Sequence, residues 1–370
     1  MSAEPALSSP PPVFLLDEPH YHRVRLGEAN RFRGVALAVD GPELSGVTVH
    51  REGIPLLEIG IDRPSPELAS IVRSPPADRR RFEFDLVVDG GAAYEIRGKL
   101  ADGGERALFL YDAPFAQRER DRLSRLWTEA SRRPAPPPEL VEATQGGRNV
   151  DAYRDSIVSG LISLESLLRA DGIAPESVED ILDVGCGTGR LLVGWSCDGR
   201  GRQLTGVDID AQLVGWNRDH LHGVARWEVG ELHPPLDLPD DRFDLVQLVS
   251  VFTHLPLSGQ REWLAEIRRL LRPGGAAIVT LHGDIYASLL LDAAGRDSFQ
   301  RSGYVERPGG PEGGRGFATF HSPGFARELF RDFGRVSWYP RGAPEHGPAR
   351  LFPIASLQDV YVLRSSQTMS

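Results

Sequence analysis

The chain has 370 residues, of which 41% are hydrophobic and 25% are charged, a composition typical of soluble globular proteins with room for two hydrophobic cores. Its formal net charge is −10 and Lys99 is its only lysine, whereas proteins that grip a nucleic acid backbone normally concentrate positive charge. Nucleic acid is therefore not expected as a partner, and no apolar run is long enough for a membrane span.

The start of the chain is rich in Ser, Pro and Ala, and it lacks the basic start and long apolar stretch of a signal peptide. We expect residues 1–19 to form a disordered tail. Two cysteines, Cys186 and Cys197, are too few for a disulfide framework. No His, Asp or Glu cluster has the spacing of metal ligands. These features predict a cytoplasmic protein without a metal site.

Residues 20–115 alternate between short apolar runs and turn residues, a pattern that predicts a small β-sandwich-like domain. Asp89-Gly-Gly91 and Asp102-Gly-Gly104 are typical of hairpin turns. This region resembles the sandwich modules attached to bacterial glycan-modifying enzymes, which implies a docking or substrate-presenting role, with a second catalytic site as the alternative. The predicted strands are 34–39, 46–49, 56–59, 81–88, 94–97 and 107–111.

Residues 116–145 are expected to connect this domain to a second one. Apolar residues at helical spacing predict a helix over 116–133, and the proline-rich stretch 134–138 stops it. A second amphipathic pattern predicts a helix over 150–168, near the start of a domain that spans residues 146–370.

The stretch from Ile181 to Arg190 reads Ile-Leu-Asp-Val-Gly-Cys-Gly-Thr-Gly-Arg. It predicts a buried strand, a tight glycine loop and the start of a helix, whose N-terminus attracts a nucleotide-like ligand. A dinucleotide fingerprint would place a small residue where Arg190 stands. Asp183 would repel a pyrophosphate but suits an ammonium group, as in S-adenosylmethionine. NAD binding, or a glycine turn without a ligand, are the alternatives.

Here the chain resembles class I methyltransferases that use S-adenosylmethionine, whose first motif is similar to residues 181–189. The resemblance implies a Rossmann-like α/β fold, with a seven-stranded sheet and helices on both faces. It continues through strand four, Phe243 to Val249, and through Arg272-Pro-Gly-Gly275. Ser250-Val-Phe-Thr-His-Leu255 and Thr280-Leu-His-Gly283 are similar to a bacterial subgroup associated with glycan and surface-polysaccharide assembly. The closing antiparallel strand pair is predicted at 335–339 and 359–363.

The resemblance implies that the cofactor pocket is built from the ends of successive strands. Asp208 ends the second strand and would accept hydrogen bonds from the ribose hydroxyls, although such an acid can also cap the following helix. Glu231 and Leu232 match the adenine-contacting turn, and Tyr153 is either a lid residue or a core aromatic. The full set of expected cofactor-binding residues is Tyr153, Asp183, Gly185, Cys186, Gly187, Thr188, Gly189, Asp208, Ile209, Glu231, Leu232 and Ser250.

Two histidines follow strands at the edge of the sheet where the reaction would take place. His254 follows strand four and His282 follows strand five, and either could accept a proton near neutral pH. The alternative is that His254 only hydrogen-bonds a loop backbone. The glycine-rich span 308–314 is expected to be a mobile loop near the acceptor pocket.

The sequence therefore predicts a cytoplasmic S-adenosylmethionine-dependent methyltransferase that O-methylates a saccharide or another hydroxylated small molecule. Its partners would be a small-molecule or glycan acceptor and a docking partner for the N-terminal β-domain. Two alternatives stay open. One is a natural-product or protein methyltransferase, and the other is a non-catalytic methyltransferase-like scaffold in a glycan-assembly complex.

Overall fold

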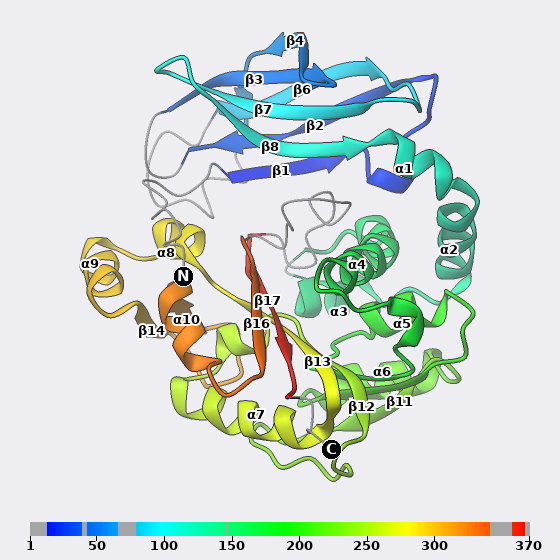
Figure 1. Cartoon of the computed structure of the whole chain (residues 1–370), viewed down its shortest axis with the longest axis vertical. Coiled ribbons are helices and arrows are strands. Elements are labelled where there is room, and N and C mark those ends of the chain that lie inside the picture. The colour runs from blue at the N-terminus through cyan, green and yellow to red at the C-terminus, as the bar shows by residue number, and fades with distance from the viewer. Residues whose placement is uncertain (1–12, 39–42, 66–78, 146, 341–356, 367–370) are drawn as a thin grey trace. The chain divides into compact units, whose positions relative to one another are not determined.

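The computed structural model describes residues 13–38, 43–65, 79–145, 147–340 and 357–366, with the chain path shown in Figure 1. Contacts divide the chain into two compact units. The N-terminal unit comprises residues 1–119 and 284–297, and the C-terminal unit comprises 120–283 and 298–370. The predicted domain limits of 20–115, 116–145 and 146–370 stay a prediction, because grouping by contact does not show which parts fold independently.

The N-terminal unit contains two four-stranded antiparallel sheets, ordered β1-β2-β6-β5 and β4-β3-β7-β8. Phe14 on β1 stacks on Phe109 on β8 at 5.8 Å between ring centroids, so the sheets pack face to face as a sandwich. The strands are β1 (Val13–Glu18), β2 (Ala29–Leu37), β3 (Leu44–Arg51), β4 (Ile54–Ile59), β5 (Arg63–Pro64), β6 (Arg79–Val87), β7 (Ala93–Leu100) and β8 (Glu105–Asp112), with a 3-10 turn η1 at Tyr21–Arg23.

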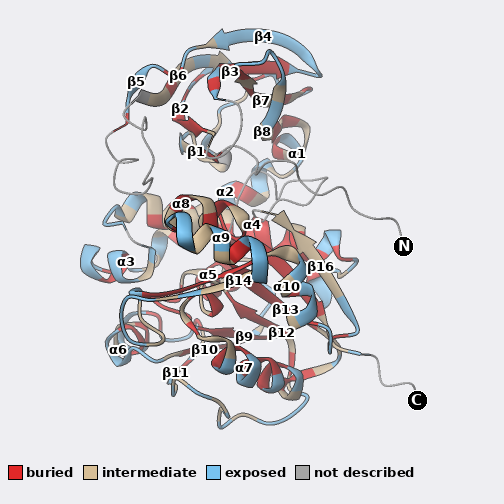
Figure 2. Cartoon of the chain, turned by 90° about the vertical axis from the view of Figure 1, so that its left-hand side faces the viewer, coloured by how far each residue is buried: buried red, intermediate tan, exposed pale blue. Residues whose placement is uncertain are grey.

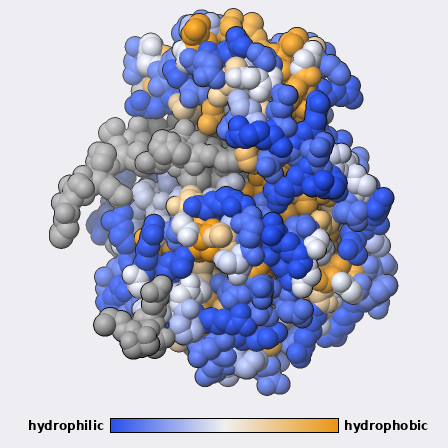
Figure 3. Space-filling view, turned by 45° about the vertical axis from the view of Figure 1, so that its right-hand side comes forward, coloured by the Kyte–Doolittle hydropathy of each residue, from blue (hydrophilic) through white to orange (hydrophobic). Residues whose placement is uncertain are grey.

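Strand β1 corrects the expectation of a disordered tail over residues 1–19. Val13 and Phe14 are buried, and β1 pairs with β2, because this short apolar run completes the core of the sandwich. The rest of the predicted tail, residues 1–12, lies outside the described residues. Figure 3 shows apolar surface on this unit, where the exposed large hydrophobic side chains are Ile54, Leu56, Leu57 and Val87.

Three helices follow the sandwich along the chain. The predicted helix over 116–133 is divided at Glu119, the C-cap of α1 (Ala113–Arg118), and α2 (Arg120–Arg132) follows it. After the proline-rich stretch comes α3 (Pro138–Gln145), which contributes Thr144 to the glycine loop described below. Figure 1 shows α2 and α3 preceding the long helix α4.

The C-terminal unit is built on a seven-stranded sheet in the order β11-β10-β9-β12-β13-β17-β16. Strands β11 to β13 of this order are parallel, and β17 pairs antiparallel with both neighbours. This confirms the predicted Rossmann-like fold and its closing strand pair. The strands are β9 (Asp180–Val184), β10 (Gln203–Asp208), β11 (Arg226–Val229), β12 (Phe243–Leu248), β13 (Leu271–Leu281), β16 (Arg335–Tyr339) and β17 (Asp359–Arg364).

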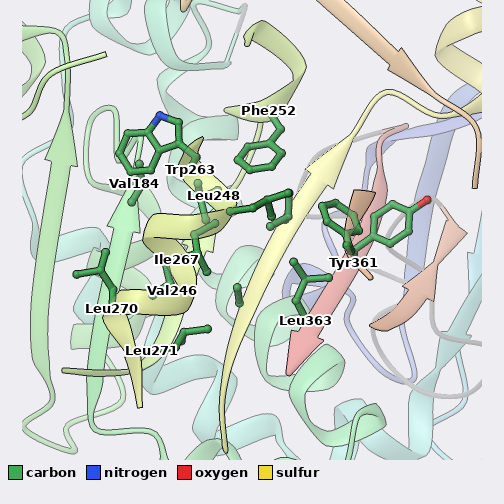
Figure 4. Close-up of a cluster of buried hydrophobic side chains, with 14 of the residues drawn as sticks. Val184, Val246, Leu248, Phe252, Trp263, Ile267, Leu270, Leu271, Tyr361 and Leu363 are labelled. Atoms are coloured by element: carbon green, nitrogen blue, oxygen red, sulfur yellow. The ribbon is translucent and has the colours of Figure 1, made fainter. Parts of the chain in front are cut away.

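Helices lie on both faces of this sheet, with α4 and α5 on one side and α7 on the other (Figure 2). Figure 4 shows the core under α7, where Trp263 and Ile267 pack on Val246 and Leu248 of β12. The remaining elements are α4 (Val150–Ala170), η3 (Pro175–Ser177), α5 (Arg190–Ser196), α6 (Ala211–His220), η4 (Phe252–His254), α7 (Leu257–Leu270), α8 (Asp284–Leu290), α9 (Ala293–Ser302), β14 (Tyr304–Pro308), β15 (Phe317–His321) and α10 (Pro323–Leu329).

Within the described residues, no helix is both long enough and apolar enough to cross a membrane. The glycine-rich span expected to be a mobile loop connects β14 and β15, which pair antiparallel. Backbone hydrogen bonds fix the ends and the tip of this connection, including Gly309 N–H to Gly316 O and Gly313 N–H to His254 O, both 2.9 Å. The structure therefore shows a hairpin that contacts the turn carrying His254.

Candidate functional site

The glycine loop, residues 185–189, joins the end of β9 to α5. All three of its glycines have φ between +54° and +74°, a backbone conformation that residues with a side chain rarely adopt. A Cβ on Gly185 would stand 2.5 Å from Val251 Cγ2, and one on Gly189 would stand 2.5 Å from the Trp227 ring. Both the backbone conformation and the close approach of neighbouring side chains therefore require glycine at these positions.

Asp208 lies directly beside this loop. Its Oδ2 accepts the Gly187 N–H at 2.7 Å, and its Oδ1 accepts the Asp210 N–H at 2.9 Å. Burial raises the pKa of Asp208, and these backbone hydrogen bonds oppose that rise. Asp210 is the cap of α6, because its carboxylate accepts from the Gln212 and Leu213 N–H groups. The cap alternative for Asp208 is thus filled by another residue, and each oxygen of Asp208 retains capacity for one more donor.

Asp183 is buried at the end of β9, with 2% of its surface exposed. Burial raises its pKa to about 7, while nearby Gln247 and Arg190 act in the opposite direction. A buried carboxyl group with a pKa near 7 is easily protonated, and a cationic ligand beside it stabilises its charged form. This is the chemistry expected of a pocket for a sulfonium that also carries an ammonium group.

Thr188 supplies a second sign that the pocket fits a ligand. Its side chain is fully buried, and Oγ1 has no hydrogen-bond partner among the described residues. Buried hydroxyls normally have a partner, so the loop has unused hydrogen-bonding capacity. Cys186 is also buried, and burial raises its pKa well above the usual range, so its thiol stays protonated.

Tyr153 does not lie as an exposed lid. It is 2% exposed, and its hydroxyl donates to Thr188 O at 3.1 Å. Burial raises its pKa to about 12. Tyr153 is therefore a core aromatic, as the alternative prediction had it. Its hydroxyl nevertheless contacts the backbone of the glycine loop.

The predicted adenine side is less enclosed. The Gly230 N–H donates to the backbone O of Asp208 at 2.9 Å, which brings the turn after β11 next to Asp208. Ile209 is 48% exposed, Leu232 is half-buried and Glu231 is exposed. A Cβ on Gly313, in the β14–β15 connection, would stand 2.6 Å from Leu232 Cδ1 and 3.2 Å from Ile209 Cδ1. The hairpin loop thus covers this apolar pair.

Ser250 lies at the end of β12 with φ +62°, a strained value for a residue with a side chain. A closed ring of hydrogen bonds holds it there. Its N–H donates to Thr280 Oγ1 at 2.7 Å, Thr280 Oγ1 donates to Gln358 Oε1 at 2.5 Å, and Gln358 Nε2 donates to Ser250 Oγ at 2.8 Å. Because Ser250 Oγ accepts from Gln358, its own proton is available to a ligand.

The two candidate catalytic histidines are neighbours, with ring centroids 6.4 Å apart. Nδ1 of His254 lies 2.9 Å from Phe317 O, and since a carbonyl only accepts, Nδ1 carries the proton. Burial lowers the pKa of His254, and Arg315 adds to the effect. His282 is 7% exposed, and burial lowers its pKa to about 3, with His254 and His321 adding to the effect. His254 is therefore the better proton acceptor of the two, and His282 is a buried neighbour that packs against it.

Sequence reasoning missed several residues that shape this site. Asn217 of α6 is fully buried and donates to Gly187 O at 2.8 Å. Thr144 of α3 would meet a Cβ on Gly187 at 2.8 Å. Gln358 and Gln260 bind groups far away in the sequence. The sequence offers one signal for such residues, which is a polar residue among the apolar positions of a helix, as Asn217 and Gln260 are.

Comparisons with known proteins agree with this geometry. Residues 181–275 match the family model described as a methyltransferase domain. The curated protein "Probable methyltransferase ltbC" of Aspergillus luteorubrus is 28% identical over 201 residues, which are 49% of this chain and 68% of that protein. A malonyl-[acyl-carrier protein] O-methyltransferase of Hahella chejuensis is 33% identical over 104 residues, 27% of this chain and 35% of that protein.

Solved structures with a similar chain path include a SAM-dependent methyltransferase from Methanosarcina mazei, at 16% identity and a TM-score of 0.39, covering 53% of this chain and 96% of that one. Another is the SAM-bound amino pentose methyltransferase CalS10 from Micromonospora echinaspora, at 17% identity and a TM-score of 0.39, covering 55% and 90%. The family match and the geometry of the site, rather than these scores, decide what the domain is. Residues 181–275 thus resemble a methyltransferase domain, and the C-terminal unit has the Rossmann-like α/β fold typical of S-adenosylmethionine-dependent methyltransferases.

Proposed function

We propose that the chain is an O-methyltransferase and that His254 is its general base. The observation that carries this is the hydrogen bond from His254 Nδ1 to Phe317 O. With the proton held on Nδ1, the lone pair of the neutral ring is on Nε2. The lowered pKa of His254 keeps the ring neutral at physiological pH, as a base must be.

When bound, S-adenosylmethionine supplies a methyl group that its sulfonium already activates. The residues of this chain then have two tasks. The glycine loop, Asp183 and Asp208 hold and orient the nucleoside, which lowers the entropic part of the barrier. His254 takes the proton of the acceptor hydroxyl on Nε2 as the methyl carbon passes from sulfur to that oxygen, so that the carbon–sulfur bond breaks as the carbon–oxygen bond forms. The resulting imidazolium keeps its Nδ1–H bond to Phe317 O.

The acceptor we propose is a saccharide or another uncharged hydroxylated molecule. A sugar hydroxyl has a high pKa and benefits from a base, whereas a neutral amine does not require one. The two histidines support an uncharged acceptor, because His254 and His282 are neutral and His282 packs on Phe320 at 5.5 Å between ring centroids. The resemblance of 250–255 and 280–283 to a subgroup associated with glycan assembly supports the same class.

A methyl-transfer screen tests this proposal. The purified chain is incubated with methyl-labelled S-adenosylmethionine and a panel of free monosaccharides, oligosaccharides, simple phenols and amines. Label should pass to hydroxyl compounds, and His254→Ala should reduce kcat by roughly 10²-fold or more while cofactor affinity stays unchanged. The control is His222→Ala, since His222 is an exposed histidine of the same unit that also bonds a backbone carbonyl. An amine as the methylated group, or full activity in His254→Ala, would refute the proposal.

The rival functions predict different results in the same screen. A natural-product methyltransferase would act on the phenols and not on the sugars, and a protein methyltransferase would label neither. A scaffold without turnover would bind the cofactor and form no S-adenosylhomocysteine with any acceptor. The proposal also includes a cytoplasmic location, supported by the two free cysteines, and a docking role for the N-terminal unit, supported by its exposed apolar side chains.

A further inference from the structure

Gln260, in the first turns of α7, is completely buried and uses both ends of its amide group. Its Nε2 lies within hydrogen-bonding distance of Leu255 O at 2.9 Å, Phe252 O at 3.0 Å and Thr319 Oγ1 at 3.2 Å. Its Oε1 accepts from His321 Nε2 at 2.9 Å. A glutamine with four polar neighbours in the core is costly to bury and therefore calls for a specific role.

These four partners belong to two separate segments. Phe252 is the first residue of the short turn η4, which carries His254, and Leu255 directly follows that turn. Thr319 and His321 belong to β15, the strand that begins with Phe317. The Thr319 hydroxyl also donates to Phe252 O at 2.9 Å, which adds a second direct link between the turn and the strand. We name this set of hydrogen bonds around Gln260 the amide clasp.

The amide clasp thus anchors both partners of the hydrogen bond that orients His254. One partner, the imidazole, is on η4, and the other, the Phe317 carbonyl, is on β15. Because these segments are 63 residues apart in the chain, local backbone geometry cannot set the distance between them. The hydrogen bonds of the Gln260 side chain go to neither His254 nor Phe317, so it acts through the elements that hold them.

We propose that Gln260 is a positioning residue for methyl transfer, which fixes His254 in the tautomer with the proton on Nδ1 and the lone pair on Nε2. The inference rests on the proposed role of His254 as base. Without the clasp, β15 and η4 separate, the Nδ1 bond to Phe317 O lengthens, and the proton is shared between the two ring nitrogens. A fraction of the molecules then presents an N–H instead of a lone pair to the acceptor.

Two other groups near His254 make no hydrogen bond with the Gln260 side chain. His282 approaches its ring from the end of β13, and Arg315 acts on its charge from the β14–β15 connection. His282 O accepts the His321 N–H of β15 at 2.9 Å, and Arg315 lies just before that strand, so both neighbours are linked to the strand that the clasp holds.

Nitrogen NMR of the imidazole rings in the full chain gives a direct test. Spectra of ¹⁵N-histidine-labelled protein are recorded over a pH series, with the His254 signals assigned by their loss in His254→Asn. We expect the native chain to show one neutral tautomer protonated at Nδ1 for His254. In Gln260→Leu the two nitrogen shifts should converge toward the average of both tautomers. Because the hydrogen bond to Phe317 O raises the pKa of His254, its lengthening should also lower the midpoint of titration.

The matched control is Asn30→Leu in the N-terminal unit. Asn30 is also a buried side-chain amide, and it also bonds backbone groups at both ends, namely Arg25 N, Arg25 O and Glu28 O. It should lower thermal stability and leave the His254 signals in place. If Gln260→Leu does not fold, Thr319→Val removes part of the same clasp and should shift the signals in the same direction to a smaller extent.

The outcome separates this inference from the proposed function. Unchanged His254 shifts and titration in a folded Gln260→Leu chain would overturn the positioning role. Isothermal titration with S-adenosylhomocysteine should give the same affinity in the native chain and in Gln260→Leu, and a loss of affinity of roughly tenfold or more would show a general disruption instead. If His254→Ala keeps full transferase activity, the base assignment fails, although the NMR result would still show whether Gln260 fixes the ring.

Discussion

The Gly187 backbone N–H donates to Oδ2 of Asp208 at 2.7 Å, and this hydrogen bond joins two predicted ligand-binding elements that are 21 residues apart. The glycine loop after β9 and the carboxylate at the end of β10 are therefore in direct contact. Adjacent parallel strands bring their carboxyl ends to one edge of the sheet, which explains the proximity.

Asp208→Ala should weaken the binding of S-adenosylhomocysteine by about 1–3 kcal/mol, because the ribose hydroxyls lose a buried acceptor. Isothermal titration measures the change. Asp210→Ala is the matched control, since it removes a carboxylate two residues away that caps α6. It should cost about 1 kcal/mol of stability in thermal unfolding and leave affinity unchanged. Equal affinities for Asp208→Ala and the native chain would remove Asp208 from the site.

Cofactor affinity should rise with pH through about 7. Burial raises the pKa of Asp183 to about 7, so its carboxyl takes up a proton below that pH, and the protonated form does not attract a cation. Titrations with S-adenosylmethionine in buffers of different ionisation enthalpy should show proton release near pH 6. Asp183→Asn should bind more weakly and lose this dependence, and a native chain with flat affinity between pH 5.5 and 8 would contradict the role.

Asp183 should also make the free energy of unfolding depend on pH. The pKa of Asp183 is higher in the folded chain than its ordinary value of 3.8, so the folded state holds the proton more tightly. Its contribution to the free energy of unfolding is fully present below about pH 4 and is lost as the pH rises through 7. Denaturant unfolding of the ligand-free chain should therefore show a decline over this window that is absent in Asp183→Asn.

Gly189→Ala should abolish cofactor binding and lower the melting temperature. The new Cβ would meet the Trp227 ring at 2.5 Å in a backbone with φ +74°. Gly199→Ala separates the two causes, because Gly199 has the same φ of +74° and a Cβ there would have no neighbouring atom within 4 Å. It should show only the backbone cost, about 1 kcal/mol. Melting curves and isothermal titration measure both variants. Equal losses of melting temperature and of cofactor affinity in Gly189→Ala and Gly199→Ala would contradict this expectation.

Gly313→Ala tests whether the hairpin loop closes over the nucleoside. Its φ is +77°, and a Cβ would stand 2.6 Å from Leu232 and 3.2 Å from Ile209, so the loop must shift away from this pair. We expect roughly tenfold weaker binding of S-adenosylhomocysteine, measured by titration. Gly324→Ala in α10, where no neighbour lies within 4 Å, should bind normally. Unchanged affinity in Gly313→Ala would mean that the loop does not contact the ligand.

The sequence predicted the sheet well because its signals are local. Apolar runs such as 243–249 form fully buried strands, and glycine or an acid marks where each parallel strand ends. The placement of Asp208 follows from that regularity. Both the existence of the closing strand pair and its direction are confirmed by the pairing of β16 with β17.

The rest of the site depends on contacts between distant segments, which no local pattern reports. Gln358 reaches Ser250 across 108 positions, and Gln260 reaches Thr319 across 59. Likewise, no local pattern in the sequence indicated that residues 284–297 belong to the N-terminal unit. Tyr153 shows a different limit, since an aromatic residue on a helix can face either a ligand or the core, and burial decides only in the folded chain.

The central claim is that residues 185–189 and Asp208 hold opposite parts of one S-adenosylmethionine. A crystal structure of the chain with S-adenosylhomocysteine measures this most directly. We predict ribose hydroxyls within hydrogen-bonding distance of Asp208, the amino-acid part against the glycine loop and Asp183, and adenine beside Ile209 and Leu232. A nucleoside bound elsewhere, or no binding at millimolar concentration, would contradict the claim.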